Sequence, residues 1–268
     1  MNAALDDVLP LLRCPETGAP LRRKSAEELV SEAGIVYPIR GGIPDLVIGA
    51  NKERYARMEG SYDAVSGWRY DFALTSTVIQ YLFWGVDKRK LPRAAEIAGG
   101  FPDGVIVDVP AGTAVFTAEA YLAKPKSVFL SVDYSMGMLR VAERRLKKAG
   151  ASNFVLVRAD VAHLPLRDAA LDGAVSLNGF HVFPEPEAGA RELGRCLKPG
   201  APFVATAACA GERYFSDVLI ERFMIPNGYF HHGLPVAAYR AMFEAGGVAD
   251  LHLDVRGAFM MATGKKGA

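Results

Sequence analysis

The stretch VIVDVPAGTAVFT at residues 105–117 decides the fold that we expect for this chain. It begins with an apolar run that ends at Asp108, which predicts a buried strand, and its last residues predict the start of a helix. The loop between them holds one glycine, Gly112, while Pro110 and Ala114 stand where a glycine-rich loop would have two more. A strand, a short loop and a helix in this order are typical of an α/β unit that binds a ligand at the loop.

Strands and helices continue to alternate toward the C-terminus. Apolar runs that end at Asp133 and Asp160 predict further buried strands, and Ser135 and Gly150 suit the two ends of the helix between them. Runs that are apolar along their whole length are typical of a parallel sheet that is covered on both faces. We therefore predict an α/β fold with a doubly wound, mostly parallel sheet of seven strands, in which a C-terminal strand runs antiparallel.

The chain divides into three parts. Its 268 residues suffice for one large domain and a small appendage. We expect residues 1–50 to form a small β-rich domain, because short apolar runs alternate there with turn residues. Residues 51–98 are rich in aromatic side chains and predict a helical cap or linker, and residues 99–268 predict the large α/β domain. An insert at about 209–233 interrupts the alternation of that domain.

The net charge and the cysteine content indicate which binding partners and which cellular compartment to expect. The net charge is +1, from 31 basic and 30 acidic residues, so we expect neither nucleic acid nor a membrane surface as a partner. The cysteines Cys14, Cys196 and Cys209 are far apart and odd in number, which favours a reducing compartment. Since there is also no signal peptide or long apolar run, we expect a cytoplasmic protein. The oligomeric state, a homodimer included, stays open.

The loop residues discriminate between cofactors. A dinucleotide loop needs several glycines so that its backbone can close on a pyrophosphate, and Pro110 and Ala114 weaken such a cradle. A ligand without phosphate at this point, such as S-adenosylmethionine, is less affected. Asp108 at the strand end also suits a cationic ligand. Asp133 follows the loop by about 20 residues, a spacing that places a carboxylate where it can accept the two hydroxyls of a ribose. We expect S-adenosylmethionine to bind and NAD not to.

Four segments carry a resemblance to a known family. VIVDVPAGTA at 105–114 and VFLSVDYSMGML at 128–139 resemble the first two motifs of class I S-adenosylmethionine-dependent methyltransferases. VRADVAHLPLRDAALDGAVSLNGFHVF at 157–183 and ARELGRCLKPGAPFVATA at 190–207 resemble the remaining motifs in the family's order. The likeness extends over about residues 95–265, and it implies a Rossmann-like fold, S-adenosylmethionine as the cofactor and methyl transfer as the activity.

The resemblance also implies where the cofactor lies. It puts the methionine end at the first strand, the ribose at the second, the adenine edge at the third, and the sulfonium near the end of the fourth. Asp160 could instead cap a turn, and Asn178 could be an ordinary loop residue. The cofactor-binding residues implied in this way are Asp108, Pro110, Ala111, Gly112, Asp133, Tyr134, Met138, Asp160, Val161, Asn178 and Gly179.

We expect a small, apolar or aromatic methyl acceptor. Aromatic side chains are concentrated before residue 99 and in the insert, where family members place acceptor-binding segments, although each is as well suited to the core. An rRNA or tRNA base methyltransferase is one alternative, and a catalytically inactive S-adenosylmethionine-binding partner protein is another. The candidate substrate-binding residues are Tyr62, Trp68, Tyr214, Phe223, Phe230 and His231.

His181 is the candidate catalytic residue. It follows the fourth strand by a few residues, so the fold would place it at the mouth of the cofactor site. An imidazole there could accept a proton from the acceptor, because its ordinary pKa lies near the working pH. A histidine that only packs or hydrogen-bonds the loop is the alternative, and both readings stay open at this point.

The N-terminal part has a resemblance of its own. LLRCPETGAPL at 11–21 and GIVYPIRGGIPDLV at 34–47 are similar to a small zinc-ribbon-like domain that precedes some bacterial rRNA guanine methyltransferases. The pattern of that domain has two C-x-x-C pairs, but here only Cys14 remains and Thr17 replaces its partner. One thiolate cannot supply the four ligands that zinc requires. We therefore expect this domain to fold without a metal.

Overall fold

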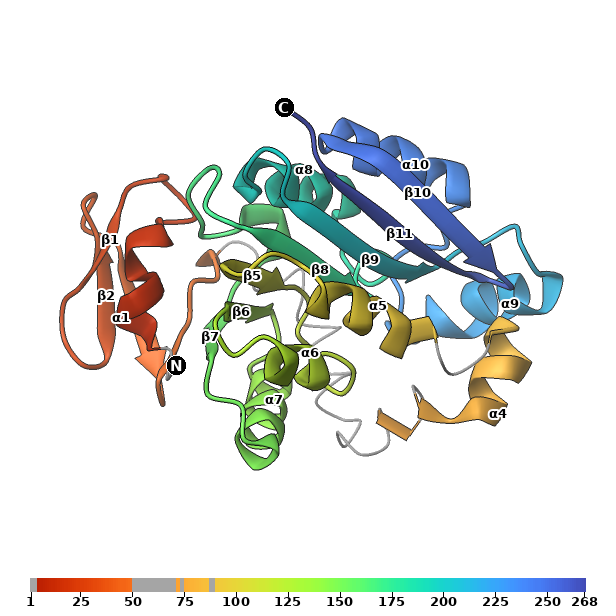
Figure 1. The fold of residues 1–268 in the computed structure, drawn as a ribbon, viewed down its shortest axis with the longest axis horizontal. Coiled ribbons are helices and arrows are strands. Elements are labelled where there is room, and N and C mark those ends of the chain that lie inside the picture. Colours follow the sequence, from red (N-terminus) through yellow and green to blue (C-terminus); the bar gives the residue numbers. More distant parts are fainter. Residues whose placement is uncertain (1–3, 50–70, 73–74, 87–89) are drawn as a thin grey trace.

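The computed structural model describes residues 4–49, 71–72, 75–86 and 90–268. A small sheet near the N-terminus lies beside one edge of a large sheet, and helices cover both faces of the large sheet (Figure 1). Among the described residues, no helix is both long enough and apolar enough to cross a membrane.

The N-terminal residues form a four-stranded sheet with the strand order β1-β2-β3-β4, and each strand pairs antiparallel with the next. Its short strands and intervening turns agree with the β-rich pattern of the sequence. The comparison of residues 1–50 with a zinc ribbon, and the boundary at residue 50, stay predictions. The elements are α1 (Leu5–Val8), η1 (Leu9–Leu11), β1 (Leu21–Arg23), β2 (Glu28–Ser31), β3 (Val36–Arg40) and β4 (Ile43–Pro44).

The described parts of the predicted helical segment 51–98 are helical. They include a π-helical turn, η3, which ends where Gly85 adopts a left-handed backbone conformation with φ 67°. Two candidate substrate residues of this segment, Tyr62 and Trp68, lie outside the described residues. The elements are α4 (Thr77–Ile79), η3 (Gln80–Trp84) and α5 (Lys90–Gly99).

The large sheet has seven strands in the order β10-β11-β9-β8-β5-β6-β7. Strands β9, β8, β5, β6 and β7 are parallel, while β11 pairs antiparallel with both β9 and β10. This confirms the predicted doubly wound fold with its antiparallel C-terminal strand. The strands are β5 (Val105–Asp108), β6 (Val128–Asp133), β7 (Phe154–Arg158), β8 (Gly173–Leu177), β9 (Pro202–Ala208), β10 (Val248–Arg256) and β11 (Phe259–Lys266).

Helices cover the two faces of this sheet in separate groups. Helix α5 contacts α6, which contacts α7, whereas α8 contacts α10 and the short helix η4 (Figure 1). The insert between β9 and α10 is also helical. The helices not yet given are α6 (Ala118–Ala123), α7 (Met136–Ala149), η4 (Val161–His163), α8 (Pro186–Cys196), α9 (Tyr214–Leu219), η5 (Ile220–Met224) and α10 (Val236–Ala245).

The strand order creates a switch point next to β5. From β5 the chain continues to β6 and β7 on one side, and it then returns to β8 and β9 on the other. The loops that leave β5 and β8 therefore diverge and open a crevice at the carboxyl ends of the strands, where ligands bind in folds of this kind. The stretch 105–117 supplies strand β5 and the loop that lies at this crevice.

Candidate active site

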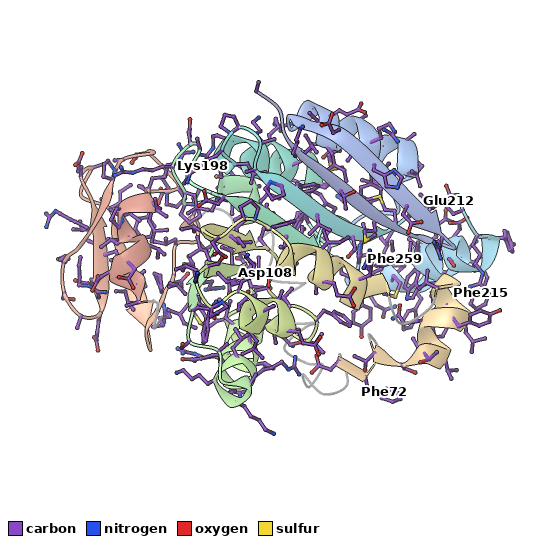
Figure 2. The ribbon with its side chains drawn as sticks, viewed as in Figure 1. Phe72, Asp108, Lys198, Glu212, Phe215 and Phe259 are labelled. Atoms are coloured by element: carbon purple, nitrogen blue, oxygen red, sulfur yellow. The ribbon has the colours of Figure 1, made fainter. Side chains whose placement is uncertain are left out.

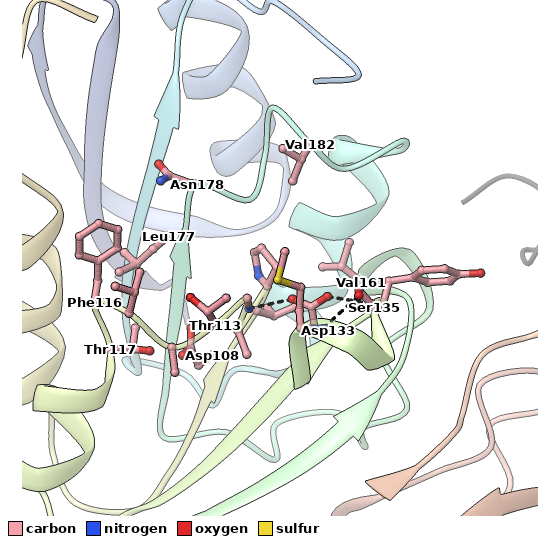
Figure 3. A pocket seen from close by; sticks show the side chains of 18 of the residues that line it. Asp108, Thr113, Phe116, Thr117, Asp133, Ser135, Val161, Leu177, Asn178 and Val182 are labelled. Atoms are coloured by element: carbon pink, nitrogen blue, oxygen red, sulfur yellow. Dashed lines mark hydrogen bonds between the residues drawn. The ribbon is translucent and has the colours of Figure 1, made fainter. Parts of the chain in front are cut away.

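A cavity opens at the carboxyl ends of β6, β5 and β8, with about 930 Å³ of empty space that includes its open mouth. In Figure 3, Phe116, Leu177 and Asn178 lie on one side of Asp108, while Asp133 and Val161 lie on the other side. The loop after β5 forms the floor between these two ends. All residues of the predicted cofactor set line this cavity except Asp160 and Gly179. That they bind a cofactor stays a prediction.

The loop after β5 is held without the usual glycines. Gly112 and Ala114 both adopt left-handed backbone conformations, with φ of 53° and 55°. Alanine adopts this conformation at a cost, because its Cβ approaches the backbone, so the surrounding fold must impose it. Hydrogen bonds hold this loop: the N–H of Ala111 donates to the carbonyl of Val132 at 2.9 Å, that of Gly112 to the carboxylate of Asp133 at 2.8 Å, and that of Ala114 to the carbonyl of Ala111 at 2.9 Å.

Arg145 of α7 anchors the same loop from outside. Its Nη1 donates to the carbonyl oxygen of Thr113 at 2.6 Å and to the hydroxyl of Thr113 at 2.8 Å. Its Nη2 pairs with Asp71, which also accepts a hydrogen bond from the Thr113 hydroxyl at 2.7 Å. Arg145 was absent from the predicted site, because it follows Thr113 by 32 residues and meets it only in the fold.

Asp133 ends β6, and each of its carboxylate oxygens accepts a backbone hydrogen bond. Its Oδ2 accepts from the N–H of Gly112 and its Oδ1 accepts from the N–H of Ser135, each at 2.8 Å. Burial raises the pKa of Asp133 to about 6, while the two N–H donors and the charge of Arg158 oppose that rise. Each carboxylate oxygen retains acceptor capacity after these bonds. This geometry suits the ribose role that the sequence assigned to Asp133.

Asp108 ends β5 and is fully buried at the floor of the cavity. Its Oδ2 accepts from the hydroxyl of Tyr121 at 2.8 Å, but its Oδ1 has no hydrogen-bond partner among the described residues. Burial raises the pKa of Asp108 to about 7, and the charge of Asp133 adds to the rise. The hydroxyl of Thr117 is near enough to oppose it, although its geometry does not make a hydrogen bond. A bound cation would satisfy the free oxygen and favour the charged form.

The β6 end of the cavity has apolar walls for a flat ring. Tyr134, Met138 and Val161 line it, as the sequence predicted, together with Ala159 and Ser135. The hydroxyl of Ser135 accepts from the N–H of Met138 at 3.1 Å, which caps α7 and holds Met138 at the cavity.

Asp160 and Gly179 each have a structural role within the described residues. The carboxylate of Asp160 accepts from the N–H of Ala162 at 2.9 Å and caps η4, which is the alternative that turn chemistry offered. The predicted adenine-edge role of Asp160 has no support from the cavity wall, to which this buried side chain does not contribute within the described residues. At Gly179, a Cβ atom would come within 2.6 Å of Pro110, Ser176 and Phe183, so only glycine fits there.

The β8 end of the cavity is mainly apolar. Phe116, Leu177, Val182 and Phe183 line it, and Asn178 adds an amide from a left-handed backbone conformation with φ 57°. The sequence predicted Asn178 here, but it did not identify the four apolar residues. Their periodicity is also that of ordinary core residues, so no local signal separates them from the core. The lining residues that the sequence analysis missed are Val109, Thr113, Ala114, Val115, Phe116, Thr117, Ser135, Ala159, Leu177, Val182 and Phe183.

His181 is buried away from the cavity wall. Its Nδ1 accepts from the N–H of Ala208 at 3.2 Å, and its ring lies 4.1 Å from that of Phe230. Burial lowers the pKa of His181 to about 3, so the imidazole is neutral and its Nε2 carries the proton. The expected position at the mouth of the site is therefore wrong, because the loop after β8 turns the ring inward. The packing alternative fits this geometry, and catalysis by His181 stays untested.

The aromatic residues of the insert do not reach the cavity as the described residues form it. Tyr214 is 84% exposed and Phe223 is 51% exposed, whereas Phe230 is buried and stacks on Trp84 with ring centroids 5.6 Å apart. His231 is half-buried and donates its backbone N–H to the carbonyl of His181 at 2.9 Å. Figure 2 shows Phe215 of α9 near the edge of the molecule, well away from Asp108. Their role as an acceptor site stays a prediction.

Cys14 belongs to a small hydrogen-bonded network with Tyr37 and Glu16. The Sγ of Cys14 lies 3.1 Å from the hydroxyl of Tyr37, which donates to Glu16 at 3.0 Å. Within the described ranges, no group of three or more His, Cys, Asp or Glu residues is arranged to hold a metal. The absence of bound zinc stays a prediction for experiment.

Comparison with known proteins identifies the family that the residues around this cavity resemble. Residues 107–205 match the family model described as "Methyltransferase domain". A demethylmenaquinone methyltransferase from Corynebacterium kroppenstedtii is 36% identical over 139 residues, which are 52% of this chain and 54% of the relative. The chain thus spans about half the length of that curated relative.

Solved structures agree in fold. A SAM-dependent methyltransferase from Thermotoga maritima superposes with a TM-score of 0.58 at 16% identity, over 79% of this chain and 99% of the other. Phosphoethanolamine N-methyltransferase 2 from Haemonchus contortus, in complex with S-adenosyl-L-methionine, gives a TM-score of 0.60 at 13% identity, over 81% and 59%. The family predicted from the motifs is confirmed: residues 107–205 are a methyltransferase domain, and the chain has the fold of S-adenosylmethionine-dependent methyltransferases.

Proposed function

We propose that the protein is an S-adenosylmethionine-dependent methyltransferase that acts on a small apolar or aromatic acceptor, with a quinone-like ring as the favoured class. The single observation that carries the proposal is the buried pair of carboxylates at the cavity floor. Asp108 has an oxygen without a partner among the described residues, and Asp133 is oriented by two N–H groups. A ligand with one cationic end and one diol satisfies both.

The chain's residues fit the cofactor along its length. Asp108 would bind the ammonium group of the methionine end, and Asp133 would accept the two ribose hydroxyls. Tyr134, Met138 and Val161 would enclose the adenine ring. When bound, S-adenosylmethionine supplies an electrophilic methyl group on its sulfonium. The loop after β5, which forms the floor of the cavity, offers few N–H groups for a pyrophosphate, and this argues against a dinucleotide as the cofactor.

The β8 end would receive the acceptor. Among the described residues at that end, Asn178 and Thr117 are the polar side chains, the others are apolar, and none carries a titratable group. The described residues at that end thus offer no strong base to an acceptor that needs one. A hydroquinone-like ring would attack the methyl carbon through an electron-rich ring atom; the methyl–sulfur bond would break, S-adenosylhomocysteine would leave, and one proton of the ring would pass to solvent. The chain's contribution would be to align the two reactants and exclude water. The name of the Corynebacterium relative supports a quinone-like acceptor.

A methyl-transfer assay with three acceptors tests this proposal. Radiolabelled S-adenosylmethionine is incubated with the protein and a reduced naphthoquinone that lacks the ring methyl group, with an rRNA fragment, or with no acceptor. Label that enters the organic extract only with the naphthoquinone supports the proposal. Label in RNA would instead support a nucleic-acid methyltransferase. Tight cofactor binding with no transfer to any acceptor would favour an inactive binding protein.

A further inference from the structure

A buried ion pair links the N-terminal domain to the large sheet. Asp45 follows β4 and its side chain is 4% exposed, while Arg158 ends β7 and its side chain is 12% exposed. The Oδ2 of Asp45 accepts from Nη1 of Arg158 at 3.1 Å and from Nε of Arg40 at 3.2 Å. Removing one partner of such a buried pair destabilises the fold strongly, because the other charge then stays buried and unpaired.

Arg158 in turn holds a residue of the cavity wall. Its Nε donates to the carbonyl oxygen of Tyr134 at 2.8 Å, and its guanidinium lies 5.1 Å from the centroid of the Tyr134 ring. Tyr134 lines the cavity directly after Asp133. One arginine therefore fixes both the backbone and the ring of this residue, which a lysine could not do with its single point charge.

The N-terminal segment also contacts Tyr134 through apolar packing and docks through its backbone. Val47 and Tyr134 form a small buried cluster, with side chains 5% and 8% exposed. The N–H of Leu46 donates to the carbonyl of Arg158 at 2.8 Å, and Asp45 pairs with Arg158 as a parallel bridge. In Figure 1 the N-terminal sheet lies beside β7 accordingly. Val47 thus contacts the wall residue Tyr134 directly, while Asp45 and Leu46 contact Arg158, which holds Tyr134.

We infer that residues 45–47 of the N-terminal domain position Tyr134, so that the affinity of the cavity for the adenine end of its cofactor depends on this domain. This inference rests on the proposed function. The N-terminal domain would then be a positioning element of the cofactor site, whatever its evolutionary relation to metal-binding domains. Asp45 and Val47 would act through Tyr134 and would not touch the cofactor.

The test measures the affinity for S-adenosylhomocysteine by calorimetry in Asp45→Asn and Val47→Ala. Loss of the charged hydrogen bond or of the packing contact should lower the affinity about threefold to tenfold, as expected for one interaction. The affinity for 5′-methylthioadenosine, which keeps the adenosine but lacks the amino acid end, should fall by the same factor. Val47→Ala keeps the buried ion pair intact, so it serves even where Asp45→Asn fails to fold.

Arg13→Gln is the matched control. Arg13 of the N-terminal domain pairs with Asp168 of the large domain at 3.3 Å, and neither residue lines the cavity or contacts Tyr134. Its substitution should leave both affinities unchanged. In a Tyr134→Ala background, Asp45→Asn should have little further effect, because the ring that it positions is gone.

The outcomes separate the inference from the function on which it rests. Unchanged affinity in folded Asp45→Asn and Val47→Ala would overturn the inference and leave the proposed function in place. Equal losses in Arg13→Gln would also overturn it, since the effect would then come from domain docking in general. A wild-type chain that binds no S-adenosylhomocysteine would overturn the proposed function, and this inference with it.

Discussion

The two ends of the cavity differ in their chemistry. At β5 and β6, two buried carboxylates are held by N–H groups and a tyrosine hydroxyl, and their pKa values are raised to about 7 and 6. At β8 the described wall is formed mainly by Phe116, Leu177 and Val182, with Asn178 and Thr117 as polar groups. One end can select a ligand by charge and hydrogen bonding, whereas the other selects mainly by shape and apolar contact.

This difference shows what each kind of recognition demands of the fold. A buried charge is costly unless its partners are fixed in advance, so both carboxylates sit at strand ends, where Asp133 accepts from two backbone N–H groups and Asp108 accepts from the Tyr121 hydroxyl. Apolar contact needs no such preparation and tolerates variation in the lining residues. We therefore expect substitutions at the carboxylate end to have large and specific effects, and those on the acceptor side to have smaller ones.

The largest effect is expected from Asp133→Ala. The variant loses hydrogen bonds to the ribose and also the acceptor of the Gly112 N–H, so the affinity for S-adenosylmethionine should fall about ten- to a hundredfold or more. Asp160→Asn is the control, because Asp160 caps η4 and does not contribute to the described cavity wall. Calorimetry would contradict the expectation if the Asp160 variant lost as much affinity as the Asp133 variant.

The next effect concerns the pH dependence of binding at Asp108. Its ionised form should bind the cationic end of the cofactor, so the affinity for S-adenosylmethionine should decrease as the pH falls through about 7. Asp108→Asn should bind about tenfold or more weakly at pH 8, because one hydrogen bond between charged groups is lost. It should also lose the dependence on pH near 7. An unchanged pH profile in this variant would assign the titration to another group.

The same substitution should stabilise the protein without cofactor. A carboxyl whose folded pKa is raised above its unfolded value stabilises the fold fully below pH 4, and this contribution is lost as the pH rises through about 7. Asn has no charge to desolvate, so Asp108→Asn should unfold at a higher temperature than wild type at pH 8, with the difference vanishing at about pH 4. Lower thermal stability at pH 8 would contradict a desolvated carboxylate.

His181→Asn should affect stability more than function. The smaller amide loses the packing of the imidazole against Phe230 and weakens the hydrogen bond from the Ala208 N–H, so the free energy of unfolding should fall by about 1–3 kcal/mol, with cofactor affinity within about twofold of wild type. In the wild type, the lowered pKa of His181 predicts a loss of stability as the pH falls from about 6.5 toward 3. A turnover loss of about 10²–10⁴ in a stable variant would restore His181 as a general base.

The smallest effect is expected in the exposed insert. Tyr214→Ser and Phe223→Ser change side chains that are exposed and remote from the described cavity wall, so turnover should stay within about twofold of wild type. Turnover with the naphthoquinone acceptor checks this. A rise of about tenfold or more in the Michaelis constant for the acceptor, with kcat unchanged, would instead support the predicted role of these aromatic residues in acceptor binding.

The features that were predictable depend on local patterns. Strands buried on both faces leave apolar runs, and the residues that end them, Asp108 and Asp133, must lie at the carboxyl edge of a parallel sheet. That logic identified the floor of the cavity and most of the β6 end. It could not decide between binding and capping for Asp160, because both roles place a carboxylate directly after a strand.

The remaining features depend on contacts between distant parts of the chain. Asp45 and Arg158 are 113 residues apart, and Arg145 meets Thr113 only after α7 packs against the sheet. The direction of His181 depends on the loop after β8 and on the N–H of Ala208, neither of which a spacing rule describes. The left-handed conformation of Ala114 likewise comes from its surroundings and not from its own preference.

The bridge between Asp45 and Arg158 also lies at the open edge of the large sheet. Strand β7 is the last strand of the large sheet on that side, and such an edge presents unpaired N–H and carbonyl groups to other chains. The N–H of Leu46 covers the final carbonyl of β7, and the N-terminal sheet shields the region beside it. We therefore expect the N-terminal sheet also to hinder edge-to-edge association of β7, and a chain that lacks this sheet to expose more of the unpaired edge of that strand.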